Sequence, residues 1–333
     1  MLEETWFDEY STDRYYSIYE DRKLIIPENA YGKDVIGILF SSNASEFQVS
    51  DTNKYLKCVD NIIFDKSGEI LLSYARYDDR EQYTAPDGTE EIYDGAMIYC
   101  WNIKEVYLPK SVKEIEPSVF RGCSSLQKVV FDQSSEKLII NWYAFSGTPL
   151  LEEVILPSFS VSIDAAAFGY ESRYMLFGFD NEEKFWAEYG GWGGQVLPGD
   201  SFCRLSDVKL TTYAQPTLTS EGTTIRWEEI EGATYYEVYQ KLNDGKYRLL
   251  GTTSGGGCRF TTLKEGKEYT FAVKAYAEIP AANYDPETDD DDEVFLLGER
   301  VPSYRLKETY DADLYPESFL IEGTMSEDIV LVG

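Results

Sequence analysis

The side chains available for chemistry are limited, because the 333-residue sequence contains no histidine. Serine–histidine and cysteine–histidine nucleophile pairs are therefore excluded, as are histidine metal sites. The glycines at 255–257 lack the lysine and the following helix that a phosphate-binding loop needs. Paired carboxylates for glycoside cleavage are compatible with a chain that has sixty acidic residues.

An acidic run between residues 285 and 293 is the strongest local charge pattern. It holds six carboxylates besides Asp285, and a calcium site would have to rest on Asp289, Asp290, Asp291 and Asp292. However, the alternating Asp-x-Asp-x-Asp-Gly spacing of a calcium loop is absent. Runs of like charge are normally solvated. The sequence therefore predicts no metal and no other cofactor.

The formal net charge of −30 restricts the classes of partner. Binding to nucleic acid needs a surplus of lysine and arginine, and docking on anionic lipid needs the same positive charge. The sequence therefore predicts binding to neither. No run of about 20 apolar residues is present, so we expect no membrane insertion. The first residues, Met-Leu-Glu-Glu-Thr-Trp, lack the basic region and the apolar region of a secretory signal peptide. Either the protein is cytoplasmic or a leader lies outside this sequence.

The elements that must position any site come from an internal repeat between residues 92 and 168. Isoleucines begin its units at 92, 115, 140 and 163, with spacings of 23, 25 and 23 residues. A small residue follows at the fourth position and Met97 or phenylalanine at the fifth, and each complete unit ends in an alternating apolar triplet. A period of 20–29 residues with this pattern predicts a solenoid, in which each unit buries its apolar face against its neighbours.

Alternation within the triplets predicts which side chains leave the core. Six residues should point inward: Val106, Leu108, Val129, Phe131, Val154 and Leu156. Their neighbours point outward, and Tyr107, Val130 and Ile155 form an apolar stripe flanked by Glu105, Lys128 and Glu153. This stripe is either a binding face or a surface covered by the second domain. These six outward residues are the candidate ligand-binding residues.

Two cysteines, Cys100 and Cys123, share one repeat position and should stack in neighbouring units. A disulfide between them is geometrically possible. Thr148 in the next unit favours small buried thiols instead.

The repeats resemble the BspA-like leucine-rich repeats of bacterial surface proteins. The resemblance rests on the units 115–131 and 140–156, on Cys-Ser-Ser-Leu at 123–126 and on Leu-Pro at 156–157. The hairpin at 60–68, which we expect as an insertion, and a helix at 182–189 resemble that family's insertion and cap. Met97 in place of phenylalanine and the incomplete last unit depart from the pattern, which leaves the number of units open.

A second domain is expected from about residue 205. Trp227, Gly232-Ala233 and Leu263-x-x-Gly266-x-x-Tyr269 resemble a bacterial fibronectin type III domain, with Trp227 as the core tryptophan and Tyr269 as the corner tyrosine. The predicted fold is mainly β: a leucine-rich repeat solenoid over 1–204, with its cap helix, followed by an Ig-like sandwich over 205–307. An acidic tail covers 308–333.

These resemblances imply a non-catalytic protein at the cell surface or secreted, which binds a host protein, matrix or polysaccharide. A solenoid lacks the deep cleft that an enzyme needs. The alternative is a structural spacer or accessory region of a larger secreted polypeptide, such as one that degrades polysaccharide.

Overall fold

The computed structural model describes residues 23–30, 39, 44–169 and 208–282, except 135, 165, 214, 261, 262 and 265, and three further strands at 303–308, 317–320 and 330–332. Leu39 is helical, and every element of two or more described residues is a β-strand. In the same residues, no helix is long and apolar enough to span a membrane. The chain divides into a first unit (1–154, 162–209 and 280–302) and a second unit (155–161, 210–279 and 303–333).

The first unit opens with short strands of both orientations. Strands β1 (Lys23–Ile26) and β2 (Glu46–Val49) form a parallel pair. Strands β3 (Leu56–Val59), β4 (Ile62–Asp65) and β5 (Ile70–Tyr74) form an antiparallel meander. The predicted hairpin of β4 and β5 is therefore confirmed.

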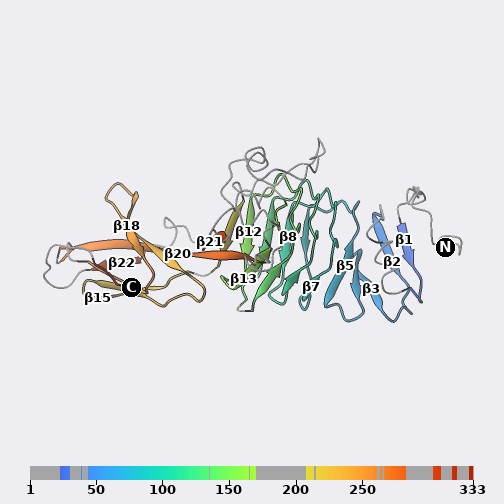
Figure 1. The fold of residues 1–333 in the computed structure, drawn as a ribbon, viewed down its shortest axis with the longest axis horizontal. Coiled ribbons are helices and arrows are strands. Elements are labelled where there is room, and N and C mark those ends of the chain that lie inside the picture. Colours follow the sequence, from blue (N-terminus) through green and yellow to red (C-terminus); the bar gives the residue numbers. More distant parts are fainter. Residues whose placement is uncertain are drawn as a thin grey trace, which may run out of the picture. The chain divides into compact units, whose positions relative to one another are not determined.

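After the meander the chain coils into two parallel columns of strands, which Figure 1 shows as successive arrows from β5 to β13. The first column contains β5, β7 (Glu91–Ile92), β9 (Glu114–Ile115), β11 (Leu138–Ile140) and β13 (Val161–Asp164). The second contains β6 (Gln82–Thr84), β8 (Glu105–Leu108), β10 (Lys128–Phe131) and β12 (Glu153–Leu156). One strand of each column with the turn between them makes one rung.

Equivalent repeat positions align in the predicted columns. Leu71 pairs with Ile92, Ile92 with Ile115 and Ile115 with Ile140. All six residues of the triplets expected to point inward are at most 1% exposed. Alternation with a period of two therefore predicted the buried face of the second column correctly.

The turns repeat as regularly as the strands. The rings of Phe120, Phe145 and Phe168 stack with centroid separations of 5.4 and 5.1 Å. The Phe120 amide donates to the Ala144 carbonyl and the Phe145 amide to the Ala167 carbonyl, each at 2.8 Å. Turn amides thus bond to the next rung, which satisfies the backbone where no sheet exists.

We expected the region from 55 to 86 to be an insertion. This expectation was wrong, because the region contains a complete rung. Leu71 occupies the position of the isoleucines, Ala75 that of the small residue, and Tyr83 pairs with Val106. Two features hid this rung from pattern analysis. Arg76 stands where later rungs have Met97 or phenylalanine, and the second-column strand comes two residues early.

The second unit contains two antiparallel groups of strands. One is formed by β15 (Leu218–Glu221), β16 (Thr224–Trp227), β19 (Gly257–Arg259) and β23 (Val330–Val332). The other is formed by β17 (Tyr235–Lys241), β18 (Tyr247–Thr253), β20 (Glu268–Ala282) and β22 (Glu317–Leu320). Strands β14 (Lys209–Thr212) and β21 (Ser303–Glu308) pair in parallel.

Residues 308–333, expected as an acidic tail, contribute strands to both groups. Strand β22 pairs with β20, and β23 pairs with β19. The terminal Val330-Leu331-Val332 supplies the β-branched and apolar residues that such a strand favours. The helix expected at 182–189 lies outside the described residues.

Candidate binding surfaces

The outward face of the second column brings together the residues predicted to bind a ligand. Lys128 pairs in register with Glu105, and Val130 with Tyr107, on strands β10 and β8. Glu153 begins β12, and its carboxylate lies 2.8 Å from the Lys128 ammonium. Ile155 is two residues further along β12 and half-buried, at the start of the second unit.

The polar groups of this face satisfy one another. The Tyr107 hydroxyl donates to the Glu105 carboxylate at 2.8 Å, and this hydrogen bond raises the pKa of Tyr107 above its usual value. Lys104 and Glu81 form a similar pair at 2.7 Å nearby. Val130 is only 6% exposed, while Tyr107 is half-buried. The predicted stripe therefore presents little apolar area.

The four candidate calcium ligands, Asp289, Asp290, Asp291 and Asp292, lie outside the described residues. Calcium binding by the acidic run therefore stays a prediction.

An aromatic group on the turns was missed by the sequence analysis. We call Tyr77, Tyr99 and Trp101 the edge cluster. The rings of Tyr77 and Trp101 are 5.1 Å apart in an edge-to-face arrangement, and those of Tyr99 and Trp101 are 6.3 Å apart with a 34° tilt. Tyr99 and Trp101 are 38% and 37% exposed. Large aromatic side chains left exposed together are typical of binding surfaces.

Tyr99 adopts a backbone conformation that disfavours bulky residues, with φ of 57°. The equivalent residues of the next two rungs are Gly122 and Gly147, with φ of 73° and 70°. A Cβ atom added to Gly122 would lie 2.3 Å from the Tyr99 ring, so that ring lies directly over Gly122. A tyrosine at a position where neighbouring units have glycine was the clue to this cluster in the sequence.

Salt bridges hold the loop beneath the edge cluster. The Arg80 guanidinium donates to both carboxylate oxygens of Asp78, at 2.8 and 2.7 Å, and to Asp60 at 2.7 Å. Hydrogen bonds from Arg80 lower the pKa of Asp78 despite its partial burial. The Asn102 amide donates to the Asp78 carbonyl at 2.9 Å, which ties the turn of Trp101 to this loop.

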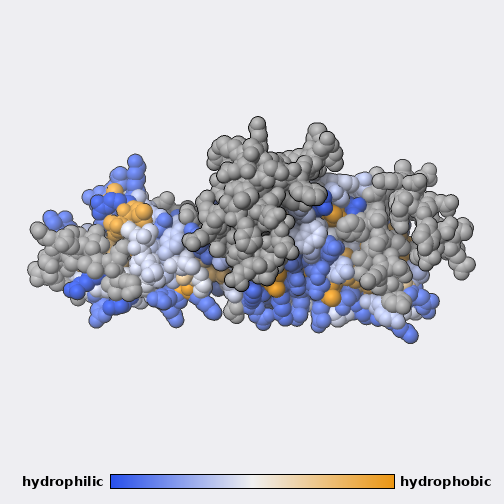
Figure 2. Space-filling model, in the orientation of Figure 1, coloured by the Kyte–Doolittle hydropathy of each residue, from blue (hydrophilic) through white to orange (hydrophobic). Residues whose placement is uncertain are grey.

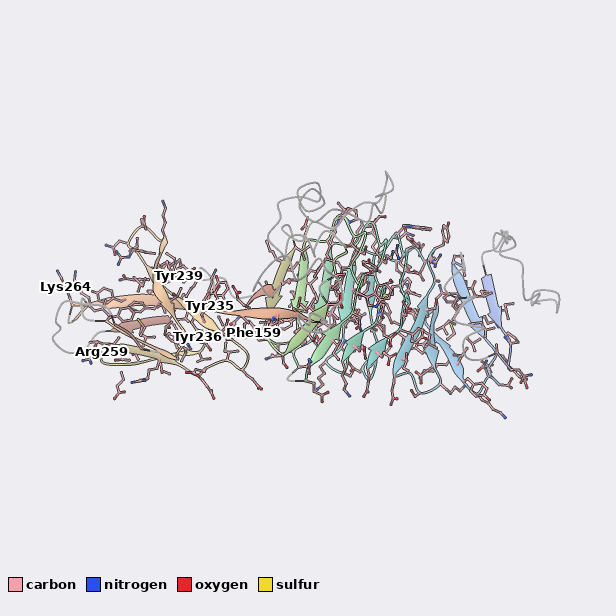
Figure 3. All side chains as sticks on the ribbon, viewed as in Figure 1. Phe159, Tyr235, Tyr236, Tyr239, Arg259 and Lys264 are labelled. Atoms are coloured by element: carbon pink, nitrogen blue, oxygen red, sulfur yellow. The ribbon has the colours of Figure 1, made fainter. Side chains whose placement is uncertain are left out.

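The second unit presents tyrosines on one face of β17 and β20. Figure 3 labels Tyr235 and Tyr239, which alternate on β17 with the buried Tyr236. Tyr235 stacks on Tyr276 at 5.0 Å, and the Tyr239 hydroxyl donates to Glu237 at 2.5 Å. Partial burial, together with Glu237, raises the pKa of Tyr239 to about 12. These groups bond among themselves and support the sheet as cross-strand pairs.

A separate apolar patch lies over β18 in the same unit, where Figure 2 shows orange atoms among hydrophilic ones. Leu242 and Leu249 are 37% and 49% exposed.

The stacked thiols agree with the expectation of unpaired cysteines. Cys100 and Cys123 are both free, and they are 2% and 0% exposed. The Cys123 thiol donates to the Met97 carbonyl at 3.0 Å. Burial raises the pKa of Cys100 well above its ordinary value, so it is a poor nucleophile.

Two parallel columns joined by stacked turns define the first unit as a β-solenoid. Residues 52–174 match the family described as BspA type leucine rich repeat region, in six copies. Residues 207–269 match a different family, the C-terminal domain of GH85 endohexosaminidases. The repeat resemblance is thus confirmed for that region, while the fibronectin type III resemblance stays a prediction. None of the curated proteins compared matches the chain.

Three solved bacterial structures are similar to parts of this chain. A leucine-rich repeat protein from Eubacterium ventriosum is 16% identical with a TM-score of 0.31, over 44% of this chain and 52% of that one. The pneumococcal vaccine antigen PcpA is 17% identical with a TM-score of 0.32, over 45% and 49%. A leucine rich cell surface protein from Faecalibacterium prausnitzii is 21% identical with a TM-score of 0.33, over 44% and 45%. The matches span about half the length of each structure.

Proposed function

We propose that this chain is a non-catalytic recognition protein, secreted or at the bacterial cell surface, whose repeats bind a host protein, matrix component or polysaccharide. The observation that carries the proposal is the six-copy match of residues 52–174 to a repeat family. Solenoids of stacked rungs present extended open surfaces, which suit macromolecular ligands better than small substrates. The absence of histidine supports a non-catalytic role.

The test is an array of glycans and matrix proteins probed with the full chain, with and without calcium. We expect a reproducible ligand. Tyr107→Ser with Ile155→Ser should abolish its binding at an unchanged melting temperature if the outward face of β8, β10 and β12 is the site. An absence of any ligand on the array contradicts the proposal. Unfolding of the variant would show that the stripe is part of the core.

A second candidate function rests on the match of residues 207–269 to the C-terminal domain of endohexosaminidases. On this proposal the chain is an accessory region of a larger polypeptide that degrades polysaccharide. Mass spectrometry of the intact polypeptide from the source cells tests it. Peptides of a hydrolase joined to this chain support the accessory role, whereas a wall-anchored chain without one contradicts it.

We also propose that the second unit is a fibronectin type III-like sandwich, and contacts within this unit support the proposal. Trp227 of β16 packs against Tyr236 of β17 at 5.4 Å, so side chains from the two strand groups meet. Phe260 and Phe271 are 4.5 Å apart. The Tyr269 hydroxyl accepts from the Lys264 amide at 3.0 Å, five residues upstream, as a corner tyrosine does. We expect Tyr269→Phe to destabilise this unit by about 1 kcal/mol, measured by denaturant unfolding; an unchanged stability contradicts the corner role.

A further inference from the structure

We propose that the edge cluster is a stacking site for a neutral glycan, with Tyr99 and Trp101 contacting the C–H face of a sugar ring. This inference rests on the proposed function and names a ligand class and a site for it. The edge cluster belongs to the turns of the rungs. It is therefore separate from the outward strand face that carries Tyr107 and Lys128.

The geometry leaves parts of the Tyr99 and Trp101 side chains exposed, at 38% and 37%. Tyr77 meets Trp101 in an edge-to-face contact, with ring centroids 5.1 Å apart and an interplanar angle of 71°. The Tyr99 and Trp101 rings have centroids 6.3 Å apart and are tilted by 34°, so one sugar ring can contact both. Among the described residues, the indole N–H of Trp101 has no hydrogen-bond partner. It is therefore available to a sugar hydroxyl.

Tyr99 has a left-handed backbone conformation at a position where the next two rungs have glycine. A left-handed conformation costs a non-glycine residue about 1–2 kcal/mol, and the next two rungs avoid this cost with Gly122 and Gly147. Ser118 and Tyr143 adopt the same left-handed conformation three residues after Ile115 and Ile140, so the turns of this solenoid tolerate it at non-glycine residues. The missing side chain of Gly122 gives the Tyr99 ring its place, so two rungs cooperate in presenting it.

The surroundings hold the rings rigidly. The Arg76 guanidinium lies 5.5 Å from the centre of the Tyr99 ring. Asn102, next to Trp101, is fixed by its bond to the Asp78 carbonyl, and Asp78 is fixed by Arg80. A site ordered before binding loses little entropy when a ligand arrives. Asn102, which follows Trp101 in the sequence, is exposed, and its side-chain oxygen can accept a hydrogen bond from a sugar hydroxyl.

The exposed area favours a sugar over a protein partner. Tyr99 and Trp101 are 38% and 37% exposed, which at roughly 200 Å² per side chain gives about 150 Å². A stable protein interface needs about 800 Å² from each partner. The area suits one or two sugar rings. Charge then selects among glycans, because a chain with a net charge of −30 repels sulfated and uronic polymers.

The experiment uses the full chain on an array of neutral oligosaccharides of glucose, mannose, galactose and N-acetylglucosamine, with heparin as the anionic comparison. The neutral oligosaccharide that binds is then titrated by calorimetry against three variants. We expect Trp101→Ala and Tyr99→Gly to weaken binding at least tenfold. Trp142→Ala is the matched control: Trp142 is 46% exposed on a later rung and should bind within twofold of the parent.

The variants separate loss of binding from loss of folding. Tyr99→Gly places in this rung the residue that the next two rungs use, so its melting temperature should not fall. Retention of glycan binding by Trp101→Ala and Tyr99→Gly overturns the inference, as does equal loss in Trp142→Ala. Binding of heparin alone also overturns it. A matrix protein that binds the parent and both edge variants equally would leave the proposed function intact and refute the glycan site.

Discussion

At Gly122 the backbone of one rung makes room for a side chain of the rung before it. The φ of 73° and the 2.3 Å approach of the Tyr99 ring give this position two separate reasons to be glycine. Repeat proteins couple neighbouring units through such contacts, so a change in one rung is felt in the next.

We predict that Gly122→Ala costs more stability than Gly88→Ala. Gly88 has a φ of 92° but nothing within 4 Å of an added Cβ, so its variant measures the backbone cost alone, about 1–2 kcal/mol. Gly122→Ala should lose about 1–3 kcal/mol more, because the methyl group meets the Tyr99 ring. Denaturant unfolding of both variants provides the comparison.

The double variant Tyr99→Gly with Gly122→Ala tests the cause. Removing the ring should return the cost of Gly122→Ala to that of Gly88→Ala. Equal losses for Gly122→Ala with and without Tyr99 would show that the ring does not occupy the space beside Gly122.

Single residues were the hardest features to predict from sequence. The alternation of apolar residues predicted which side chains of the triplets point inward. It did not predict the burial of Val130, because alternation indicates the face of the sheet on which a side chain lies and not whether other residues cover that face. The exposure of Tyr99 and Trp101 was missed because the sequence analysis considered only the faces of the strands, whereas these two residues lie in turns. The stacked, unpaired Cys100 and Cys123 were predicted correctly from their shared repeat position.

At the scale of elements, the turns contribute to the core alongside the strands. Phe120, Phe145 and Phe168 are at most 2% exposed and form a continuous stack across three rungs. The sequence indicates this stack, because phenylalanine recurs five positions after Ile115, Ile140 and Ile163, although Met97 follows Ile92. It could not reveal the earliest rung in the same way, since Arg76 interrupts the aromatic series.

We predict that Phe145→Ala lowers the free energy of unfolding by about 3–5 kcal/mol. The ring contacts an aromatic neighbour on both sides and is fully buried, so its removal leaves a cavity that neither side can fill. Trp142→Ala, three residues earlier but exposed, should cost less than about 1 kcal/mol. Similar losses for the two variants in denaturant unfolding would argue against a continuous stack.

Parallel pairing also creates an electrostatic cost along the first column. Glu91 pairs in register with Glu114, and partial burial together with Glu114 and Asp65 raises the pKa of Glu91. Because the folded-state pKa exceeds the unfolded value, the protonated form favours folding. This contribution is complete below the unfolded value of about 4.3, and it is lost as the pH rises through the folded-state pKa.

We therefore predict that Glu91→Gln is more stable than the parent at pH 7 and that the difference shrinks as the pH falls to 4. Unfolding at both pH values measures it. Glu90→Gln is the control, since Glu90 lies 3.2 Å from Lys113 and its loss should weaken the fold slightly at pH 7. A pH-independent effect of Glu91→Gln would contradict the assigned repulsion.

At the scale of the whole molecule, sequence reasoning predicted the repeat architecture of the first unit and the β character of the second. The boundary expected at residue 205 stays a prediction, because residues 201–207 lie outside the described part of the chain. The division into two units was harder to predict. Residues 155–161 belong to the second unit although the residues on both sides belong to the first, and residues 280–302 belong to the first unit although the residues on both sides belong to the second. Strands β22 and β23 were missed because residues 308–333 are acidic and show only one short apolar run.

The central claim is that consecutive rungs stack so that even the turns bond to the next rung. Amide hydrogen exchange in the full chain tests it most directly. We predict strong protection for Phe120, Gly122 and Phe145, whose amides donate across rungs at 2.8 Å to Ala144, Ser146 and Ala167. Turns that were not stacked would leave these amides open to water. Rapid exchange at all three, with protection confined to the strands, would contradict the account.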